Sequence, residues 1–341
     1  MIEHKYIHKQ AFVLESGERL EQLEITYHTL GRFSTDINNV IWVCHALTAN
    51  SDPSDWWDDM VGDGKYYNPE KHFVICANIL GSCYGTTGPL SDNPATNEPY
   101  YNDFPLISIR DMVKAHEILR QYLGINRIHT LIGSSIGAFQ ALEWSIAQPD
   151  IFDYMIFIAS NCQVSPWATA FNESQRMAIR TDSTFLSRQH DGGLDGMKVA
   201  RSIALLSYRS YSGYNATQQE DSIDFTEAAR ASSYQRYQGD KLSKRFNAYS
   251  YYSLTRSIDS HNVGRSRGSA KNALARVKAC TLLIAISSDV LFPPKEMKYM
   301  NKYLPNSEYH CIDSAFGHDG FLIEAEQLQQ TITNFYKNNI I

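Results

Sequence analysis

The sequence lacks a long apolar run. Its apolar stretches, of which residues 281–286 are typical, fall far short of the roughly 20 apolar residues that a membrane-spanning helix needs. The first residues, 1–6 (MIEHKY), also lack the apolar centre of a signal peptide, and polar residues follow at once. We therefore expect a cytoplasmic protein with no membrane partner.

Basic residues are too few and too dispersed for nucleic-acid binding. The chain has 31 Lys and Arg against 37 Asp and Glu, a net charge of -6, and no basic run long enough to follow a phosphate backbone. Hydrophobic residues make up 43% and charged residues 20%, which excludes a disordered or collagen-like chain. A length of 341 residues favours one large domain that carries an insertion.

Cysteines are few for the length, and none forms a C-x-x-C pair. In the pairs Cys44-His45 and His310-Cys311, neighbouring side chains of a strand point to opposite faces, so neither pair can hold one metal ion. We expect buried free thiols rather than disulfides, and no metal site. The six cysteines are Cys44, Cys76, Cys83, Cys162, Cys280 and Cys311.

Short apolar runs alternate with helical patterns along the chain. Such an alternation, with short connections, indicates a mostly parallel sheet with helices on both faces. The runs typical of buried strands are 40–44, 73–77, 128–132, 154–159, 281–286 and a weaker 307–312. The helical patterns span 109–123, a segment from about 136 that must stop before Pro149, and 327–336.

The pattern changes between residues 163 and 278. Strand-like runs disappear there, and Arg, Ser, Tyr, Gln and Ala follow helical periodicities. The strand signal then returns at 281–286, so the helical segment interrupts one sheet. We expect a core domain from 1–162 and 279–341, and a helical lid insertion over 163–278.

The pentapeptide GSSIG at 133–137 is a G-x-S-x-G motif between an expected strand and an expected helix. A sharp turn between them needs small residues on both sides of a strained residue, and it exposes the central hydroxyl. This predicts Ser135 as a nucleophile, with Ser134 the weaker candidate because it holds an x position. A glycine-rich turn without catalysis is the alternative.

A serine hydroxyl needs a base, and the base needs a carboxylate that fixes its tautomer. Asp289 follows the expected strand 281–286, and His318 follows the next strand, which gives the order Ser, acid, His of α/β-hydrolases. We predict the triad Ser135, Asp289 and His318. Asp313 is the reserve acid.

An oxyanion needs backbone amides near the nucleophile. The amide of Ile136 begins the helix after Ser135, and the loop after the strand 40–44 would supply that of Leu47. We interpret His45 in this loop as a residue of loop geometry rather than a base. The glycine-rich stretch 81–88 lacks the Lys-Ser/Thr end of a phosphate loop, and we expect it to shape the pocket.

Beyond the elbow, the chain resembles the homoserine O-acetyltransferase family, acyltransferases built on the α/β-hydrolase fold. The resemblance covers almost the whole chain. Its stretches are HALT at 45–48, WWD at 56–58, LGSCYGTTGP at 80–89, FP at 104–105, RDMV at 110–113, QALEW at 140–144, ARSIA at 200–204, SYRS at 207–210, YQG at 237–239, SD at 288–289, LFP at 291–293 and GHD at 317–319.

The resemblance implies three acceptor contacts. Arg201 would pair with the homoserine carboxylate, Tyr208 would lie on the same helical face, and Asp319 would hold the amino group. It also implies the activity, which is transfer of acetyl from acetyl-CoA, a co-substrate and not a bound cofactor, to L-homoserine for methionine biosynthesis. The acetyl group would pass through a Ser135 acyl-enzyme with ping-pong kinetics. We expect a homodimer, because helical insertions beside a site often dimerise.

The elbow departs from the family pattern GGSMGGM at Ser134, Ile136, Ala138 and Phe139. Ala49 replaces a common glycine, and Gly320 replaces a common alanine. We expect several of these residues to line the acyl pocket, so succinyl-CoA as donor or serine as acceptor remains an alternative. An esterase and a non-catalytic ligand-binding α/β-hydrolase scaffold are the further alternatives.

Overall fold

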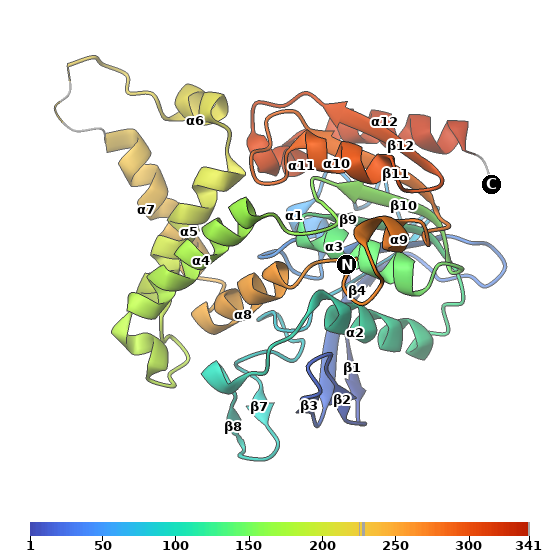
Figure 1. Ribbon diagram of the computed structural model, residues 1–341, viewed down its shortest axis with the longest axis horizontal. Coiled ribbons are helices and arrows are strands. Elements are labelled where there is room, and N and C mark those ends of the chain that lie inside the picture. Colours follow the sequence, from blue (N-terminus) through green and yellow to red (C-terminus); the bar gives the residue numbers. More distant parts are fainter. Residues whose placement is uncertain (225, 227–228, 340–341) are drawn as a thin grey trace.

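The computed structural model describes residues 1–224, 226 and 229–339, and its centre is an eight-stranded sheet (Figure 1). Neighbouring strands from β6 to β12 run parallel, and β4 pairs antiparallel with both β1 and β6. In spatial order the strands are β1 (Ile2–His8), β4 (Leu23–Leu30), β6 (Phe73–Ala77), β5 (Val40–Cys44), β9 (Ile128–Ser134), β10 (Phe152–Ile158), β11 (Cys280–Ile286) and β12 (Ser307–Ile312).

The central strands are buried on both faces, which explains their continuous apolar runs. On β5, alternate residues enter different clusters: Trp42 packs in one cluster, while Ile41 and Val43 pack in the other. The apolar face of α12 contributes Leu328 to the second cluster. The helices beside the sheet are α2 (Ile109–Tyr122), α3 (Ile136–Ala147), α9 (Ala270–Leu274), α10 (Pro294–Asn301), α11 (Gly320–Ile323) and α12 (Ala325–Asn338).

Local signals set the helix starts. Helix α2 begins after Ser108, whose hydroxyl accepts a bond from the Asp111 amide while the Asp111 carboxylate accepts one from the Ser108 amide. Helix α3 begins without a side-chain cap. The remaining short elements are α1 (Pro53–Trp56), the 3₁₀ turns η1 (Tyr101–Asp103), η2 (Ser183–Leu186) and η3 (Gly317–Asp319), and the strand pairs β2 (Phe12–Val13) with β3 (Arg19–Leu20) and β7 (Asp92–Asn93) with β8 (Glu98–Pro99).

A group of helices lies between β10 and β11 and stands to one side of the sheet in Figure 1. Helix α5 packs against α4 and α7, and α4 also packs against α8. These helices are α4 (Pro166–Thr181), α5 (Leu194–Tyr208), α6 (Tyr211–Gln218), α7 (Ala229–Ser243) and α8 (Ala248–Asp259). We refer to α4–α8 as the lid helices. The expected domain limits at 162 and 279 stay predictions.

The strands and helices expected from the sequence are present, while β1 and β4 of the central sheet were not expected. The fold is the expected α/β-hydrolase architecture, and the strands expected at 40–44 and 73–77 are β5 and β6. The expectation of buried free thiols holds for four cysteines, while Cys83 is half-buried and Cys311 is exposed. Among the described residues, no helix is both long enough and apolar enough to cross a membrane.

Candidate active site

Ser135 stands between a strand and a helix. Strand β9 ends at Ser134 and α3 begins at Ile136, so Ser135 alone makes the connection. Its φ of 54° lies in the left-handed region, which residues with a side chain rarely adopt. The Ser135 amide donates a 3.1 Å hydrogen bond to the carbonyl of Ile158 on β10. The turn is the sharp strand-to-helix corner that the motif predicts.

The glycines on both sides of this corner are required by close backbone packing. A Cβ atom at Gly133 would overlap the carbonyl oxygen of Gly137, and one at Gly137 would overlap the carbonyl oxygen of Cys44. Both obstacles are main-chain atoms, which cannot rotate away. The G-x-S-x-G spacing therefore follows from the packing of α3 on β9 and β5.

His318 and Asp289 form a buried pair. His318 lies in η3 and Asp289 follows β11, and the His318 Nδ1 lies 2.7 Å from the Asp289 Oδ2. The other carboxylate oxygen accepts hydrogen bonds from the amides of Leu291 and Phe292, at 2.8 and 2.9 Å. Because an ionised carboxylate only accepts, Nδ1 carries the proton and Nε2 is left free as a base.

The environment of His318 favours its protonated form. Burial lowers the pKa of the imidazole, but the charge and hydrogen bond of Asp289 and the charge of Asp319 outweigh it. The net pKa of His318 lies above the ordinary value. A base with a raised pKa accepts a proton from an incoming hydroxyl more readily.

Two backbone amides border Ser135. Within the described part of the chain, neither the Leu47 nor the Ile136 amide has a hydrogen-bond acceptor. Leu47 lies in the loop after β5, and Ile136 is the first residue of α3, where the helix dipole adds positive potential. Both residues line the small pocket next to Ser135. Free amides there suit a developing oxyanion.

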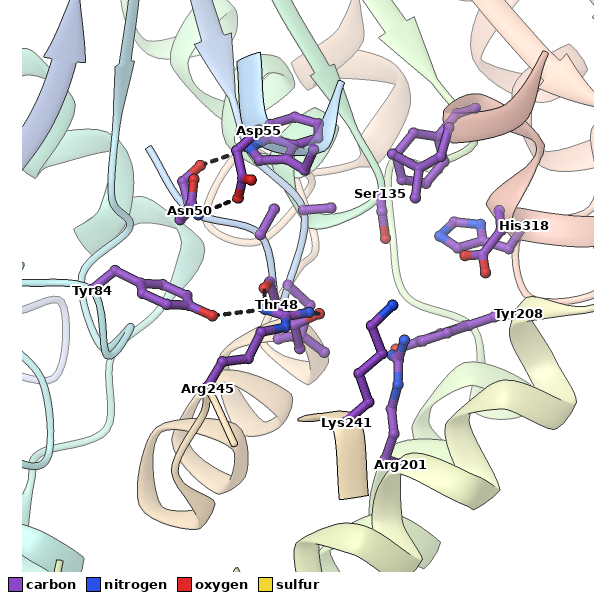
Figure 2. Close-up of a pocket in the computed structure, with 17 residues that line it drawn as sticks. Thr48, Asn50, Asp55, Tyr84, Ser135, Arg201, Tyr208, Lys241, Arg245 and His318 are labelled. Carbon is purple, nitrogen blue, oxygen red and sulfur yellow. Dashed lines mark hydrogen bonds between the residues drawn. The ribbon is translucent and has the colours of Figure 1, made fainter. Parts of the chain in front are cut away.

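A cavity of about 590 Å³ opens above these groups. Figure 2 shows the Ser135 hydroxyl and the His318 ring projecting into it, with side chains of the lid helices facing them. Its size fits a ligand much larger than a single amino acid. The lining residues are Ala46, Leu47, Thr48, Ala49, Asn50, Asp55, Trp56, Tyr84, Ser135, Arg201, Tyr208, Lys241, Arg245, His318, Asp319, Phe321 and Leu322.

Arg201 and Tyr208, both on α5, reach this cavity from the lid side (Figure 2). The Arg201 guanidinium carbon lies 5.4 Å from the centre of the Tyr208 ring, and that ring lies 5.8 Å from the His318 ring. Among the described residues, no carboxylate forms an ion pair with Arg201. The guanidinium is therefore available to an anion that enters the cavity.

Asp319 lies in the same cavity but already has a partner. Its Oδ2 is 2.8 Å from the Arg209 Nη1, and both side chains are largely buried. Arg209 also donates a 3.3 Å bond to the hydroxyl of Tyr234. Arg209, to which the sequence assigned no role, fixes the Asp319 carboxylate and neutralises part of its charge.

Two residues weighed for the triad lie elsewhere. Asp313 accepts a 2.9 Å bond from the Ser287 hydroxyl, so the carboxylate on His318 is that of Asp289. His45 is buried between two loops, where Nδ1 bonds the Ala46 carbonyl and Nε2 accepts from the Ile79 amide. Burial lowers its pKa to about 4, with Ala46 and His116 as smaller influences. Neutral His45 thus supports the loop that carries Leu47.

A second, much smaller space lies beside Ser135. It measures about 20 Å³, which is close to the room that one water molecule needs, roughly 10–15 Å³. Its walls include Ile136 and Phe139, two of the departures from the family motif. The Phe139 ring stacks on His261 at 3.9 Å and meets Phe292 at 5.5 Å, so this wall is tightly packed.

The other departures have different settings. Ala49 lines the large cavity, whereas Ser134 and Ala138 are buried and line neither space. At Gly320 a Cβ atom would lie 2.8 Å from a methyl of Ile286 and 3.0 Å from the Ser314 hydroxyl. Glycine there allows η3, with His318, to pack closely on the sheet.

A family model described as alpha/beta hydrolase fold matches residues 39–325. The homoserine O-acetyltransferase of Cyclobacterium marinum is 44% identical over 331 residues, which cover 97% of this chain and 94% of the relative. The chain belongs to the homoserine O-acetyltransferase family.

Solved structures agree on the fold. A homoserine O-acetyltransferase from Bacillus anthracis has a TM-score of 0.93 at 23% identity, covering 100% of this chain and 98% of that chain. An acetylester hydrolase from Corynebacterium glutamicum has a TM-score of 0.85, also at 23% identity. The match covers 98% of this chain and 95% of that chain. A fold common to transferase and esterase does not by itself decide between them.

In this homoserine O-acetyltransferase family member, two further cations that the sequence analysis missed lie in the cavity. They are Lys241 near the end of α7 and Arg245 just beyond it. The only feature of the sequence that indicated these cations was the basic segment DKLSKR at 240–245. The same pattern is typical of the solvated end of a helix. Among the described residues, no group of three or more His, Cys, Asp or Glu side chains could hold a metal ion.

The raised pKa of His318 predicts a pH dependence. The Nε2 atom accepts a proton only when the His318 ring is neutral. The kcat/KM for acetyl-CoA should therefore rise with pH, and the midpoint of this rise should lie above 6.5, the ordinary pKa of histidine. Asp319→Asn removes a negative neighbour that favours the imidazolium, so it should lower this midpoint. A pH-rate profile of the wild-type protein and of Asp319→Asn measures both midpoints. A wild-type midpoint below 6.5, or an upward shift in the variant, would contradict the assignment of His318.

Proposed function

We propose that the chain transfers an acetyl group from acetyl-CoA to the hydroxyl of L-homoserine, giving O-acetyl-L-homoserine for methionine biosynthesis. The observation that carries the proposal is that one cavity is lined by Ser135, by His318 with Asp289 behind it, by a free guanidinium and by a carboxylate. Ser135, His318 and Asp289 suit acyl transfer, while the guanidinium and the carboxylate suit the charges of an amino acid. Membership of the homoserine O-acetyltransferase family supports the same substrates.

The first half-reaction acylates Ser135. The Ser135 Oγ attacks the thioester carbonyl as His318 Nε2 takes its proton, and the Leu47 and Ile136 amides hold the oxyanion. Collapse of this intermediate breaks the carbon–sulfur bond. CoA leaves as a thiol with the proton from His318, whose cation Asp289 stabilises.

The second half-reaction discharges the acyl-enzyme. The homoserine hydroxyl gives its proton to His318 Nε2 and attacks the ester carbonyl, and the bond to Ser135 Oγ breaks. The proton returns to the Ser135 oxygen, which restores the free enzyme. Because one serine serves both substrates in turn, the kinetics are ping-pong.

The acceptor is recognised by charge. The Arg201 guanidinium pairs with the substrate carboxylate, and the Asp319 carboxylate binds the ammonium while Arg209 holds its other side. The Tyr208 ring lies near both Arg201 and His318 and forms part of the wall against which the substrate binds. This arrangement aims the side-chain hydroxyl of an amino acid at His318.

The acyl pocket favours acetyl over succinyl. The 20 Å³ space beside Ser135 matches a methyl group, and a chain with two methylenes and a carboxylate is far larger. Its described lining contains no Lys or Arg to pair with a second carboxylate. Burying an unpaired carboxylate costs several kcal/mol.

The direct test combines two donors and two acceptors. Acetyl-CoA and succinyl-CoA are each assayed with homoserine and with serine, and CoA release and acylated product are both measured. We expect acetyl-CoA with homoserine to be best, and succinyl-CoA to react roughly 100-fold more slowly or worse because its carboxylate must be buried unpaired. Preference for succinyl-CoA or for serine would overturn the substrate assignment.

The same assay addresses the esterase and scaffold alternatives. An esterase would release acetate from the acyl-enzyme as fast without homoserine as with it. A non-catalytic scaffold would release no CoA and would not react with a fluorophosphonate probe. A cytoplasmic location and a homodimer, both expected from the sequence, stay predictions.

A further inference from the structure

One wall of the cavity carries two positive charges that have no carboxylate partner in the described part of the chain. This wall is formed by the end of α7 and the residues just after it. Lys241 and Arg245 both line the cavity that holds Ser135 (Figure 2). Within the described residues, neither side chain forms an ion pair. Both are exposed and line the cavity, so their charges are accessible to an anion that enters it.

Arg245 is fixed by neutral acceptors. Its Nη1 donates to the Thr48 carbonyl and, at 2.7 Å, to the Tyr84 hydroxyl, while Nη2 lies 3.5 Å from the Thr48 hydroxyl. These bonds orient the guanidinium without neutralising it. A cation oriented in advance binds an anion at a smaller entropic cost than a mobile one.

Some cations elsewhere in the lid helices are paired, as Lys198 is with Asp195. Arg236 and Arg256 form no ion pair among the described residues, but they lie outside the cavity. Lys241 and Arg245 are therefore distinguished by being unpaired and by lining the cavity that holds Ser135. The unpaired positive charge of the cavity wall is a local feature and not a consequence of overall composition, since the net charge of the chain is -6.

Neither carboxylate of the cavity forms an ion pair with these two cations. Asp55 accepts a 3.2 Å bond from the Asn50 side-chain amide, and Asp319 is paired with Arg209. The single carboxylate of the acceptor pairs with Arg201. The positive wall thus exceeds what a small amino acid needs, and the cavity volume of about 590 Å³ also exceeds it.

We infer that Lys241 and Arg245 form an anion site for the phosphate-bearing arm of the thioester donor. The inference rests on the proposed function, because it assigns to acetyl-CoA the part of the cavity that the acceptor leaves open. The acyl end of the donor lies at Ser135, and its phosphates lie toward Lys241 and Arg245. Electrostatic attraction between this wall and the phosphates also accelerates encounter with the donor.

The test compares two donors that share the acyl thioester. Acetyl-CoA carries phosphates, and S-acetyl-N-acetylcysteamine carries none. Lys241→Gln should lower the ratio of kcat/KM for acetyl-CoA to kcat/KM for the truncated thioester roughly tenfold, because only the first donor loses a charged contact. An unchanged ratio would overturn the inference, and so would a loss confined to the KM of homoserine, which would place Lys241 in the acceptor site.

Two control variants distinguish the loss of a phosphate contact from a disturbed oxyanion loop. Arg245→Gln also releases Thr48, next to Leu47, but a disturbed oxyanion loop would slow both donors equally, whereas a lost phosphate contact lowers the ratio. Lys278→Gln removes a lysine that pairs with Asp150, outside the cavity, and should leave the ratio unchanged.

A binding measurement distinguishes failure of this site from failure of the proposed function. Adenosine 3′-phosphate 5′-diphosphate, which carries the phosphates of CoA without the pantetheine arm and the thioester, should bind the wild-type protein in calorimetry and bind Lys241→Gln roughly tenfold more weakly. This result needs no turnover. Equal affinities for the two proteins would refute the anion site even if acetyl transfer is observed.

Discussion

Replacement of Ser135 by alanine should reduce acetyl transfer to homoserine roughly 10⁶-fold, since loss of a triad nucleophile removes nearly all of the covalent route. The fold should persist. The Ser135 hydroxyl has no hydrogen-bond partner among the described residues, and alanine meets the same backbone restriction at φ 54° as serine does. Initial rates with acetyl-CoA and homoserine, together with thermal unfolding, measure both effects.

Ser134→Ala is the matched control for this variant. Ser134 is the adjacent residue at the end of β9, and it lines neither the cavity nor the small pocket. It should keep most of the wild-type rate. Near-normal turnover in Ser135→Ala, or an equal loss in Ser134→Ala, would mean that the elbow does not supply the nucleophile.

Arg201→Ala should lower the rate of the second half-reaction about 30- to 1000-fold. That range corresponds to about 2 to 4 kcal/mol for a charge-assisted pair in a site that excludes water. Acetylation of Ser135 should continue, because the first half-reaction uses the triad and the oxyanion amides. Rapid quenching after acetyl-CoA is added, first without and then with homoserine, separates the two steps.

Lys198→Ala controls for the loss of a cation from the same helix. Lys198 lies on α5 and pairs with Asp195, outside the cavity. This variant should discharge the acyl-enzyme at a near-normal rate. If Arg201→Ala leaves the dependence on homoserine concentration unchanged, the acceptor assignment fails even if the triad stands.

The sequence predicted those parts of the fold that are buried on both faces. The runs at 40–44 and 73–77 have no polar interruption, because β5 and β6 are fully buried in the sheet. The sequence analysis assigned no strand to Ile2–His8 or Leu23–Leu30. The first is an edge strand with no buried residue, in which Glu3 and Lys5 interrupt the apolar residues, and neither strand contains an uninterrupted apolar run.

The triad residues could be predicted because their positions depend on the order of strands along the chain. Ser135, Asp289 and His318 each follow a strand, and parallel strands bring their carboxyl ends to one edge of the sheet. The positions of Arg209, Lys241 and Arg245 depend on how the lid helices pack over that edge. Tertiary packing of this kind leaves no mark in local periodicity, so these cations looked like ordinary residues of solvated helices.

The acetyl-enzyme itself tests the central claim most directly. The protein is mixed with acetyl-CoA in the absence of homoserine, quenched in acid, digested and examined by mass spectrometry. We predict that the peptide containing Ser135 gains the mass of one acetyl group while CoA is released, and that added homoserine removes this mass as O-acetyl-L-homoserine forms. If no acetyl group is found on Ser135 and CoA appears only when homoserine is present, transfer does not proceed through Ser135 and the account is contradicted.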